Sequence, residues 1–255
     1  MTMHFGMTNH EMLHIAKMQL ATDLNCTVDD FTRDGFVFCE AKENPGRRPF
    51  PRGERHFELL TMGGASIVSA SQDILPYIRE QLVDKSLDDA FNMPFVHGQG
   101  ICFLPDILNP LPMPDGVDIS NLERDEIIKL YEHCPRDDFP YVFSYDTNHP
   151  RPDMLATLAM VDGNIAGIAG VSADCEMLWQ IGINVRSEYR NKGIATALTN
   201  KLAINVIAHG KIPYYATAPR NIASQRVAIR AGFLPAWTCV YKGRFDNMLT
   251  ESTCG

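Results

Sequence analysis

The chain has 255 residues, a formal net charge of −8 at pH 7 and seven cysteines. This acidic balance excludes a sequence-independent nucleic-acid binder, which needs a basic face, and no apolar run reaches the length that spans a bilayer. Because the cysteines are odd in number and scattered, and because the first residues lack the apolar core of a signal peptide, we expect reduced thiols in a cytoplasmic protein.

Residues 10–24 are predicted to form a helix, because apolar side chains recur on one broad face. The start of this segment, His10-Glu11-Met12-Leu13-His14, matches the H-E-x-x-H pattern of zinc metalloproteases. The pattern begins too early for a preceding sheet to form a substrate edge. The third ligand would have to come from Asp29, Asp30 or His56. We therefore keep a metalloprotease as a remote alternative and expect no metal.

The next eighty residues predict a small α+β unit. In order, the patterns indicate a short helix opened by Thr27, a strand over 35–41, a hairpin of strands 57–62 and 66–70 through Gly63-Gly64, and helices over 72–83 and 87–91. A basic cluster interrupts them and consists of Arg47, Arg48, Arg52 and Arg55. It is either a solvated loop or a contact for a phosphate group.

Four prolines between residues 104 and 116 mark the predicted domain junction, since proline at that density continues neither a helix nor a strand ladder. We expect an N-terminal α+β domain of unknown role over residues 1–110 and a second domain over residues 111–255. The second domain begins with a predicted hairpin, whose strands over 154–160 and 164–171 are joined by the turn Asp162-Gly163.

The most informative stretch follows a predicted strand over 178–185. A polar turn, Arg190-Asn191-Lys192-Gly193, leads into a helix whose apolar residues recur every fourth position from Ile194 and which Gly210 ends. This order directs free main-chain N–H groups and the positive end of a helix dipole at one point, which suits a bound phosphate. Neither a Walker loop nor a Rossmann glycine pattern is present.

Two further elements complete the pattern: a predicted strand over 212–217, and a helix that opens with Asn221 and ends before Gly232-Phe233. Together with Arg190-Asn191-Lys192-Gly193-Ile194-Ala195, they resemble the GNAT acetyltransferase superfamily over roughly residues 115–245. The resemblance implies an α/β (α+β) fold class: a mixed, mostly antiparallel sheet flanked by helices, here with a smaller α+β N-terminal domain.

The resemblance also implies acetyl-CoA as cosubstrate, held largely by main-chain groups. Its pantetheine arm would lie between two splayed strands, 180–185 and 214–217, and its pyrophosphate would lie on the polar turn. The cofactor-binding residues carried over in this way are Ile183, Val185, Arg190, Asn191, Lys192, Gly193, Ile194, Ala195, Asn221 and Ser224.

The catalytic residues of the family do not carry over. Where many members have a tyrosine in the last helix, this chain has Ala228, and where others have a glutamate base it has Trp179. Nearby candidates are Asp174, Cys175, Glu176, Tyr214 and Tyr215. Of these we prefer Glu176 as a base working through water and Tyr215 as the acid.

We therefore expect an N-acetyltransferase that acts on a primary amine of a small molecule or peptide, without nucleic-acid or membrane partners. Peptide, aminoglycoside and polyamine acceptors are all compatible with the pattern, and so is a homodimer. Because both family catalytic residues are missing, a catalytically inactive acyl-CoA-binding or sensor protein is the main alternative.

Overall fold

The computed structural model describes residues 7–50 and 55–245, and they form two compact units. Unit 1 contains the described residues up to Leu13 together with Phe103–Pro235, and unit 2 contains His14–Cys102 and the described residues from Ala236 onward. Two strands, β4 (Val96–Pro105) and β10 (Phe233–Gly243), have residues in both units. The predicted division of the chain after residue 110 into domains with separate roles stays a prediction.

Unit 1 is built on a mixed sheet with the strand order β4-β9-β8-β7-β6-β5. Its further strands are β5 (Asp118–Glu123), β6 (Asp153–Val161), β7 (Asn164–Ala173), β8 (Leu178–Val185) and β9 (Ile212–Thr217). Neighbours from β5 to β8 pair antiparallel, whereas β8 and β9 pair parallel. The parallel pair requires a crossover, and α5 (Ile194–Ala208) supplies it.

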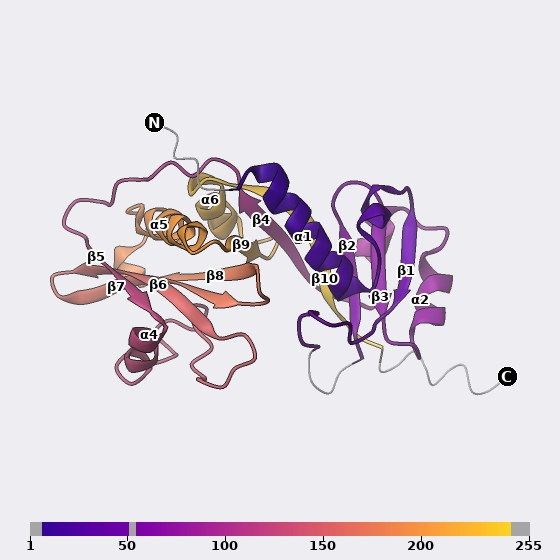
Figure 1. Cartoon of the computed structure of the whole chain (residues 1–255), viewed down its shortest axis with the longest axis horizontal. Helices are drawn as coiled ribbons and strands as arrows, with labels where there is room; N and C mark the ends of the chain where they lie inside the picture. Colours follow the sequence, from indigo (N-terminus) through magenta and orange to yellow (C-terminus); the bar gives the residue numbers. More distant parts are fainter. Residues whose placement is uncertain (1–6, 51–54, 246–255) are drawn as a thin grey trace. The chain divides into compact units, whose positions relative to one another are not determined.

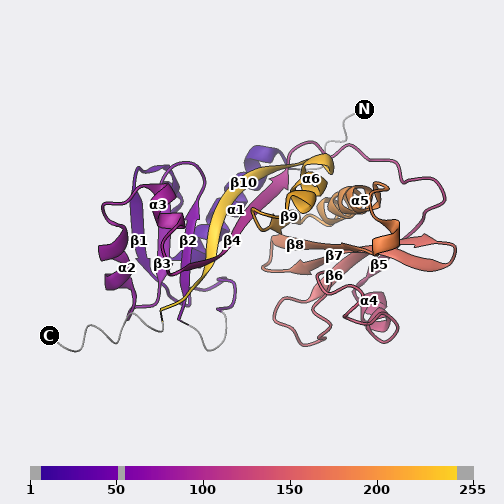
Figure 2. The ribbon, with the colours of Figure 1, turned by 180° about the vertical axis from the view of Figure 1, so that it is seen from behind.

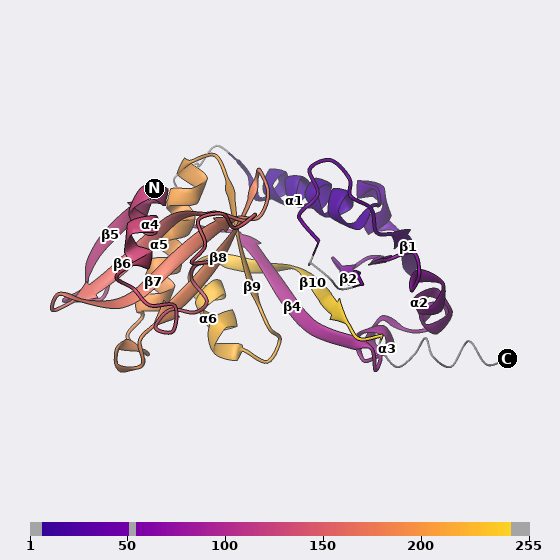
Figure 3. The same ribbon diagram turned by 90° about the horizontal axis from the view of Figure 1, so that it is seen from below.

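Helices cover both faces of this sheet. Figures 1 and 2 show α5 on one side of the strands β5–β8 and α4 (Arg124–Tyr131) on the other. Beside β9 lies α6 (Ile222–Arg230), as Figure 3 shows. The contact of α5 is close, because a Cβ added to Gly167 of β7 would meet side chains of Val185 and Leu198. Between β8 and α5 lies one turn of 3₁₀ helix, η2 (Ser187–Tyr189).

Unit 2 has the strand order β1-β3-β2-β10-β4, with β1 (Phe36–Glu40), β2 (Phe57–Thr61) and β3 (Ser66–Ala70). The helices α2 (Leu75–Leu82) and α3 (Leu87–Phe91) share a core with this sheet, in which Phe57, Phe95 and Phe245 pack edge-on or tilted with ring centroids 5.4–5.6 Å apart. The C-terminal part of α1 (Asn9–Leu24) and the 3₁₀ helix η1 (Val28–Thr32) belong to the same unit.

The fold class expected from the sequence is confirmed, and so are several local details. Asp162 and Gly163 both have positive φ, +49° and +78°, as a two-residue hairpin turn requires. Other predictions were incomplete. The sequence patterns did not identify β4, β5, α4 or most of β10, and Pro105 is the last residue of β4 rather than part of a loop.

Candidate active site

The parallel strands β8 and β9 separate partway along their length. Their pairing covers four residue pairs and ends at Ile181 with Tyr215. Within these fully described strands, β8 continues to Val185 and β9 to Thr217 without further pairing between them. The main-chain edges beyond Ile181 therefore form a wedge that an extended group can enter as an added strand would.

At the end of β8 the chain turns into α5 through two residues in the left-handed region, Asn191 at φ +62° and Gly193 at φ +84°. Among the described residues, none of the main-chain N–H groups from Asn191 to Thr196 donates a hydrogen bond; the first bond of the helix runs from Ala197 to the Gly193 carbonyl. Asn191, Lys192 and Gly193 are exposed. The turn thus presents a set of free donors at a helix N-terminus, where an anion is favoured.

The basic side chains around this turn are partly engaged. Arg190 Nε donates to the Val185 carbonyl at 3.0 Å, and Arg186 forms an ion pair with Asp138 at 2.7 Å. A carbonyl oxygen has two lone pairs, so Val185 keeps one for a further donor. Arg190 therefore helps to hold the turn against β8.

The start of α6 lies next to the wedge. Asn221 caps the helix, with its Oδ1 accepting from the Ser224 N–H at 3.1 Å. The Ser224 hydroxyl forms a hydrogen bond of 2.7 Å with the hydroxyl of Tyr215. Of the predicted residues, Tyr215 and Ser224 are therefore brought together where the pairing of β8 and β9 ends, and Ile183 and Val185 lie in the unpaired part of β8.

The two tyrosines of β9 lie on opposite faces of the sheet, because strand side chains alternate. Tyr215 packs against the rings of Phe103 and Phe233, and burial raises its pKa above the usual value of a phenol, an effect that the Ser224 hydrogen bond opposes. Tyr214 instead donates to the carboxylate of Asp174. Each buried hydroxyl thus has a partner.

Glu176 is exposed in the bend that precedes Leu178, the first residue of β8. The pairing of β8 with β9 ends at Ile181, about 10 Å farther along the strand at roughly 3.3 Å per residue. The structure therefore does not bring Glu176 into contact with Tyr215, and a role for this carboxylate in proton transfer requires intervening water.

Several contacts near the wedge have no signal in the local sequence. Adding a Cβ to Gly182 would bring it against the Tyr141 carbonyl, so the loop around residue 141 lies directly on β8. The buried Asn200 of α5 bonds to main-chain groups of Asn109, Leu111 and Ala231. Both arrangements join segments that are distant in the sequence, which a pattern in one segment does not reveal.

The H-E-x-x-H segment has a local structural use. The Glu11 carboxylate accepts hydrogen bonds from the main chain and the hydroxyl of Thr8, at 2.6 and 2.8 Å, and thereby caps the start of α1. His10 and His14 are exposed. No group of three or more potential metal-ligating side chains gathers anywhere in residues 7–50 or 55–245.

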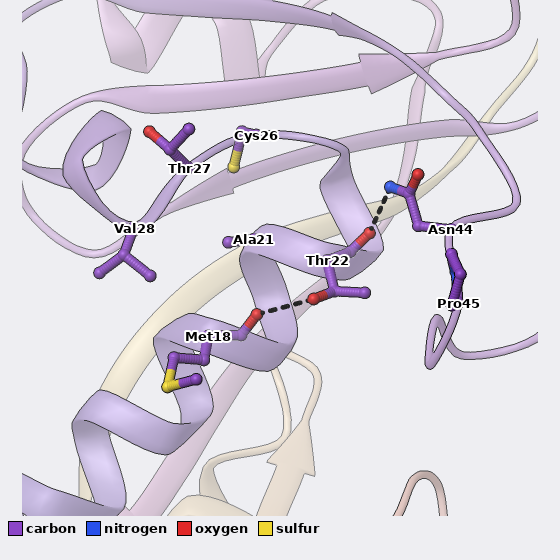
Figure 4. A pocket seen from close by; sticks show the side chains of 8 residues that line it. All are labelled: Met18, Ala21, Thr22, Cys26, Thr27, Val28, Asn44 and Pro45. Carbon is purple, nitrogen blue, oxygen red and sulfur yellow. Dashed lines mark hydrogen bonds between the residues drawn. The ribbon is translucent and has the colours of Figure 1, made fainter.

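The basic cluster lies in unit 2 and is engaged there; its member Arg52 lies outside the described residues. Arg48 pairs with the buried Asp23 at 2.6 Å, Arg55 pairs with Asp73 at 2.6 Å, and Arg47 lies over the ring of Phe50. A shallow pocket of about 450 Å³ in the same unit is lined by Met18, Ala21, Thr22, Cys26, Thr27, Val28, Asn44 and Pro45 (Figure 4). None of the predicted site residues lines it.

Six of the seven cysteines are described, and all six are free thiols; Cys254 lies outside the described residues. In the part of the chain that the structure covers, no helix combines the length and apolar character that crossing a bilayer requires.

Comparison with known proteins identifies one family. Residues 117–233 match the model of the acetyltransferase (GNAT) family. Similar solved structures include a GCN5-related N-acetyltransferase-like protein from Streptococcus suis, with 17% identity over 71% of this chain and 72% of that one and a TM-score of 0.42. No curated protein sequence matches the chain.

Two further solved structures have comparable similarity. A GCN5-related N-acetyltransferase from Sphaerobacter thermophilus has 17% identity over 59% of this chain and 52% of that one, with a TM-score of 0.43. An acetyltransferase from the GNAT family of Colwellia psychrerythraea has 11% identity over 92% of this chain and 72% of that one, with a TM-score of 0.45. The chain thus spans from about half to about three quarters of the length of these proteins.

Proposed function

We propose that this chain, which belongs over residues 117–233 to the GNAT acetyltransferase family, transfers the acetyl group of acetyl-CoA to a primary amine of a small molecule or peptide. The observation that carries the proposal is the free main-chain N–H groups from Asn191 to Thr196 at the start of α5, next to the wedge between β8 and β9. A diphosphate at the turn and an extended arm in the wedge would use donors and acceptors that the fold leaves unpaired.

The reaction needs a neutral amine, and at neutral pH most of a primary amine is protonated. With an amine pKa near 10, the neutral form costs roughly 4 kcal/mol at pH 7, which a base or a desolvating site must partly supply. We keep Glu176 as this base, acting through water because its carboxylate is exposed and remote from the wedge. Tyr215 is the proposed acid for the leaving thiolate, since its raised pKa keeps the phenol protonated at neutral pH.

Thiol release from acetyl-CoA in the presence of primary amines tests both assignments. Tyr215→Phe is expected to lower kcat on the order of 10²-fold, because it removes the proton donor. Ser224→Ala is the matched control, since it breaks the same hydrogen bond but leaves the phenol in place. Equal losses of kcat in the two variants would show that the Tyr215 hydroxyl acts through its hydrogen bond with Ser224 and not as the proton donor.

Glu176→Ala is expected to lower the rate and to change the shape of the pH–rate profile while the affinity for acetyl-CoA stays the same. A pH–rate profile identical to that of the wild type would exclude this carboxylate as the base.

A binding protein without catalysis is the second candidate, and the residue at position 228 favours it. Ala228 is fully buried in α6, where the family's frequent tyrosine acid would stand. Acetyl-CoA binding without thiol release, across alkylamine, polyamine, amino-sugar and peptide acceptors, would support this alternative.

A further inference from the structure

Three polar side chains form a continuous chain on the sheet face opposite α5. The hydroxyl of Tyr214 donates to the carboxylate of Asp174, and the same hydroxyl oxygen lies 3.1 Å from the side-chain amide oxygen of Gln180, Oε1. Asp174 and Tyr214 are each 3% exposed, whereas Gln180 is half-buried. This chain of hydrogen bonds therefore leads from the buried carboxylate of Asp174 to the partly exposed side chain of Gln180.

The single proton of the Tyr214 hydroxyl determines which end of the Gln180 amide faces it. A tyrosine hydroxyl has one proton, and a carboxylate attracts it more strongly than a neutral amide oxygen does. With its proton on the Asp174 side, the Tyr214 oxygen can only accept from Gln180. The two ends of a glutamine amide have the same shape, so hydrogen bonding decides which end faces Tyr214. The structure places Oε1 there, opposite a hydroxyl oxygen whose only proton is used by Asp174. Exchanging the two ends of the amide brings the Nε2 amino group to Tyr214 as a donor and turns the amide oxygen away.

A second buried aspartate on the same side of unit 1 shows what a purely structural arrangement looks like. Asp153 accepts from the Tyr131 hydroxyl at 2.5 Å and from the main chain and hydroxyl of Ser144, both at 2.8 Å. These bonds hold the end of α4 and the loop at Ser144 against β6. The other partners of Asp174 are more distant, Ser172 Oγ at 3.3 Å and Arg151 Nη1 at 3.5 Å. Its short bond runs to Tyr214 and onward to Gln180.

Gln180 lies next to the place where acetyl transfer would occur. It pairs with Tyr214 in the last but one pair of β8 and β9, so its main chain is about 3.3 Å along the strand from the end of the pairing. A primary ammonium group has three N–H donors and no acceptor, and an outward amide oxygen matches it. Because this oxygen is neutral, it binds the amine without an ion pair that would oppose its later deprotonation.

We propose that Gln180 binds the acceptor amine through its amide oxygen, and that Asp174 and Tyr214 are positioning residues that hold this oxygen outward. The inference rests on the proposed acetyl transfer to an amine. It assigns the acceptor class as a primary amine that enters in its cationic form.

Kinetics with the best acceptor among an alkylamine, spermidine, glucosamine and a peptide with a free N-terminus test the binding role. Gln180→Ala is expected to raise KM for the amine about tenfold, the effect of one lost hydrogen bond to a charged group. Asp174→Ala should do the same without removing the amide, because Tyr214 then has no carboxylate to donate to, its proton turns to Gln180, and the amide oxygen rotates back toward Tyr214. The Kd of acetyl-CoA should stay unchanged in both variants.

Comparisons among variants distinguish a positioning role of Asp174 and Tyr214 from a purely structural one. Combining Asp174→Ala with Gln180→Ala should raise KM no further than either change alone, because both remove the same outward amide oxygen. Ser172→Ala is the matched control: it removes the other side-chain hydroxyl beside Asp174 but leaves the bond to Tyr214 intact, so KM should stay at the wild-type value. Tyr214→Phe breaks the chain without changing the aspartate and should also raise KM. Additive effects in the double variant would overturn the proposal.

A readout that needs no acceptor tests the hydrogen-bond chain itself. In ¹⁵N-labelled full-length protein, the Gln180 side-chain amide signal is the one missing from Gln180→Ala, and it should shift in Asp174→Ala and Tyr214→Phe but not in Ser172→Ala. A Gln180 amide signal that does not shift in Asp174→Ala would overturn the proposed hydrogen-bond chain but leave the proposed acetyl transfer standing. Wild-type protein that binds acetyl-CoA but acetylates none of the four amines would overturn the proposed function, and with it the binding role of Gln180.

Discussion

At the scale of single residues, buried polar groups in this protein divide into those with partners and those without. Asn200 is 1% exposed and bonds to three main-chain groups, so it joins α5 to residues 109–111 and to the end of α6. His56 in unit 2 is different: its Nε2 is buried without a hydrogen-bond partner among the described residues. A buried histidine that cannot share its charge should be held neutral.

His56 makes unit 2 sensitive to acid. Burial and the nearby Arg47 guanidinium together lower its pKa to about 4, against a smaller opposing effect of the Asp23 carboxylate. In the unfolded chain the pKa of histidine is about 6.5. Between that pH and about pH 4, the unfolded state binds a proton at His56 and the folded state does not, so the free energy of unfolding falls as the pH is lowered. The whole pKa difference between the two states corresponds to a loss of about 3 kcal/mol in the free energy of unfolding.

Urea unfolding at pH 7 and at about pH 4, near the pKa of His56 in the folded protein, measures this effect. His56→Gln should lose less stability between the two conditions than the wild type does. His14→Gln, which changes an exposed histidine, should behave as the wild type. Equal acid sensitivity in wild type and His56→Gln would contradict the prediction.

At the scale of elements, α5 is buried around more of its circumference than its sequence pattern indicates. The predicted apolar residues are buried, but so are Ala197, Thr199 and Asn200. Its two ends are both glycines with positive φ, Gly193 at +84° and Gly210 at +71°. This similarity allows the proposed pyrophosphate site to be tested against a control at the other end of the same helix.

Gly193→Glu should weaken acetyl-CoA binding at least tenfold, because a carboxylate then occupies the turn whose free N–H groups would bind the pyrophosphate. Gly210→Glu introduces a comparable backbone strain of about 1–2 kcal/mol. Because this glycine lies where no cofactor is expected, the Kd of acetyl-CoA for this variant should equal that for the wild type. Calorimetric titration with acetyl-CoA measures both, and thermal unfolding checks that both variants fold. Unchanged affinity in Gly193→Glu would contradict the cofactor assignment.

At the scale of the whole molecule, the segment that matches the family ends before the chain does. Residue 233 is the last residue of the match, whereas β10 continues to Gly243 and pairs with β2 through Thr238–Val240. Val240 is fully buried in the core of unit 2. The sheet of unit 2 is thus completed by β10, which follows the family segment in the sequence and pairs with β2, which precedes it.

Val240→Asp should therefore destabilise unit 2 by more than about 4 kcal/mol, since it buries an unpaired charge. Amides of β2 should lose protection against hydrogen exchange. Tyr241→Asp places the same charge on the neighbouring residue, whose side chain is 58% exposed, and should leave that protection intact. Equal loss of protection in both variants would contradict this account of β10.

The sequence alone determined those features that depend on neighbours in the chain. The Asp162-Gly163 turn, the polar turn before Ile194, the glycine at the end of α5 and the family resemblance are all local patterns, because turn dihedrals and helix caps are set by a few adjacent residues. The tertiary structure decided which of the two tyrosines of β9 meets Ser224 and which meets Asp174, that Gln180 lies beside Tyr214, and that β10 belongs in part to unit 2. These outcomes depend on strand register and on contacts between distant segments, which no local pattern specifies.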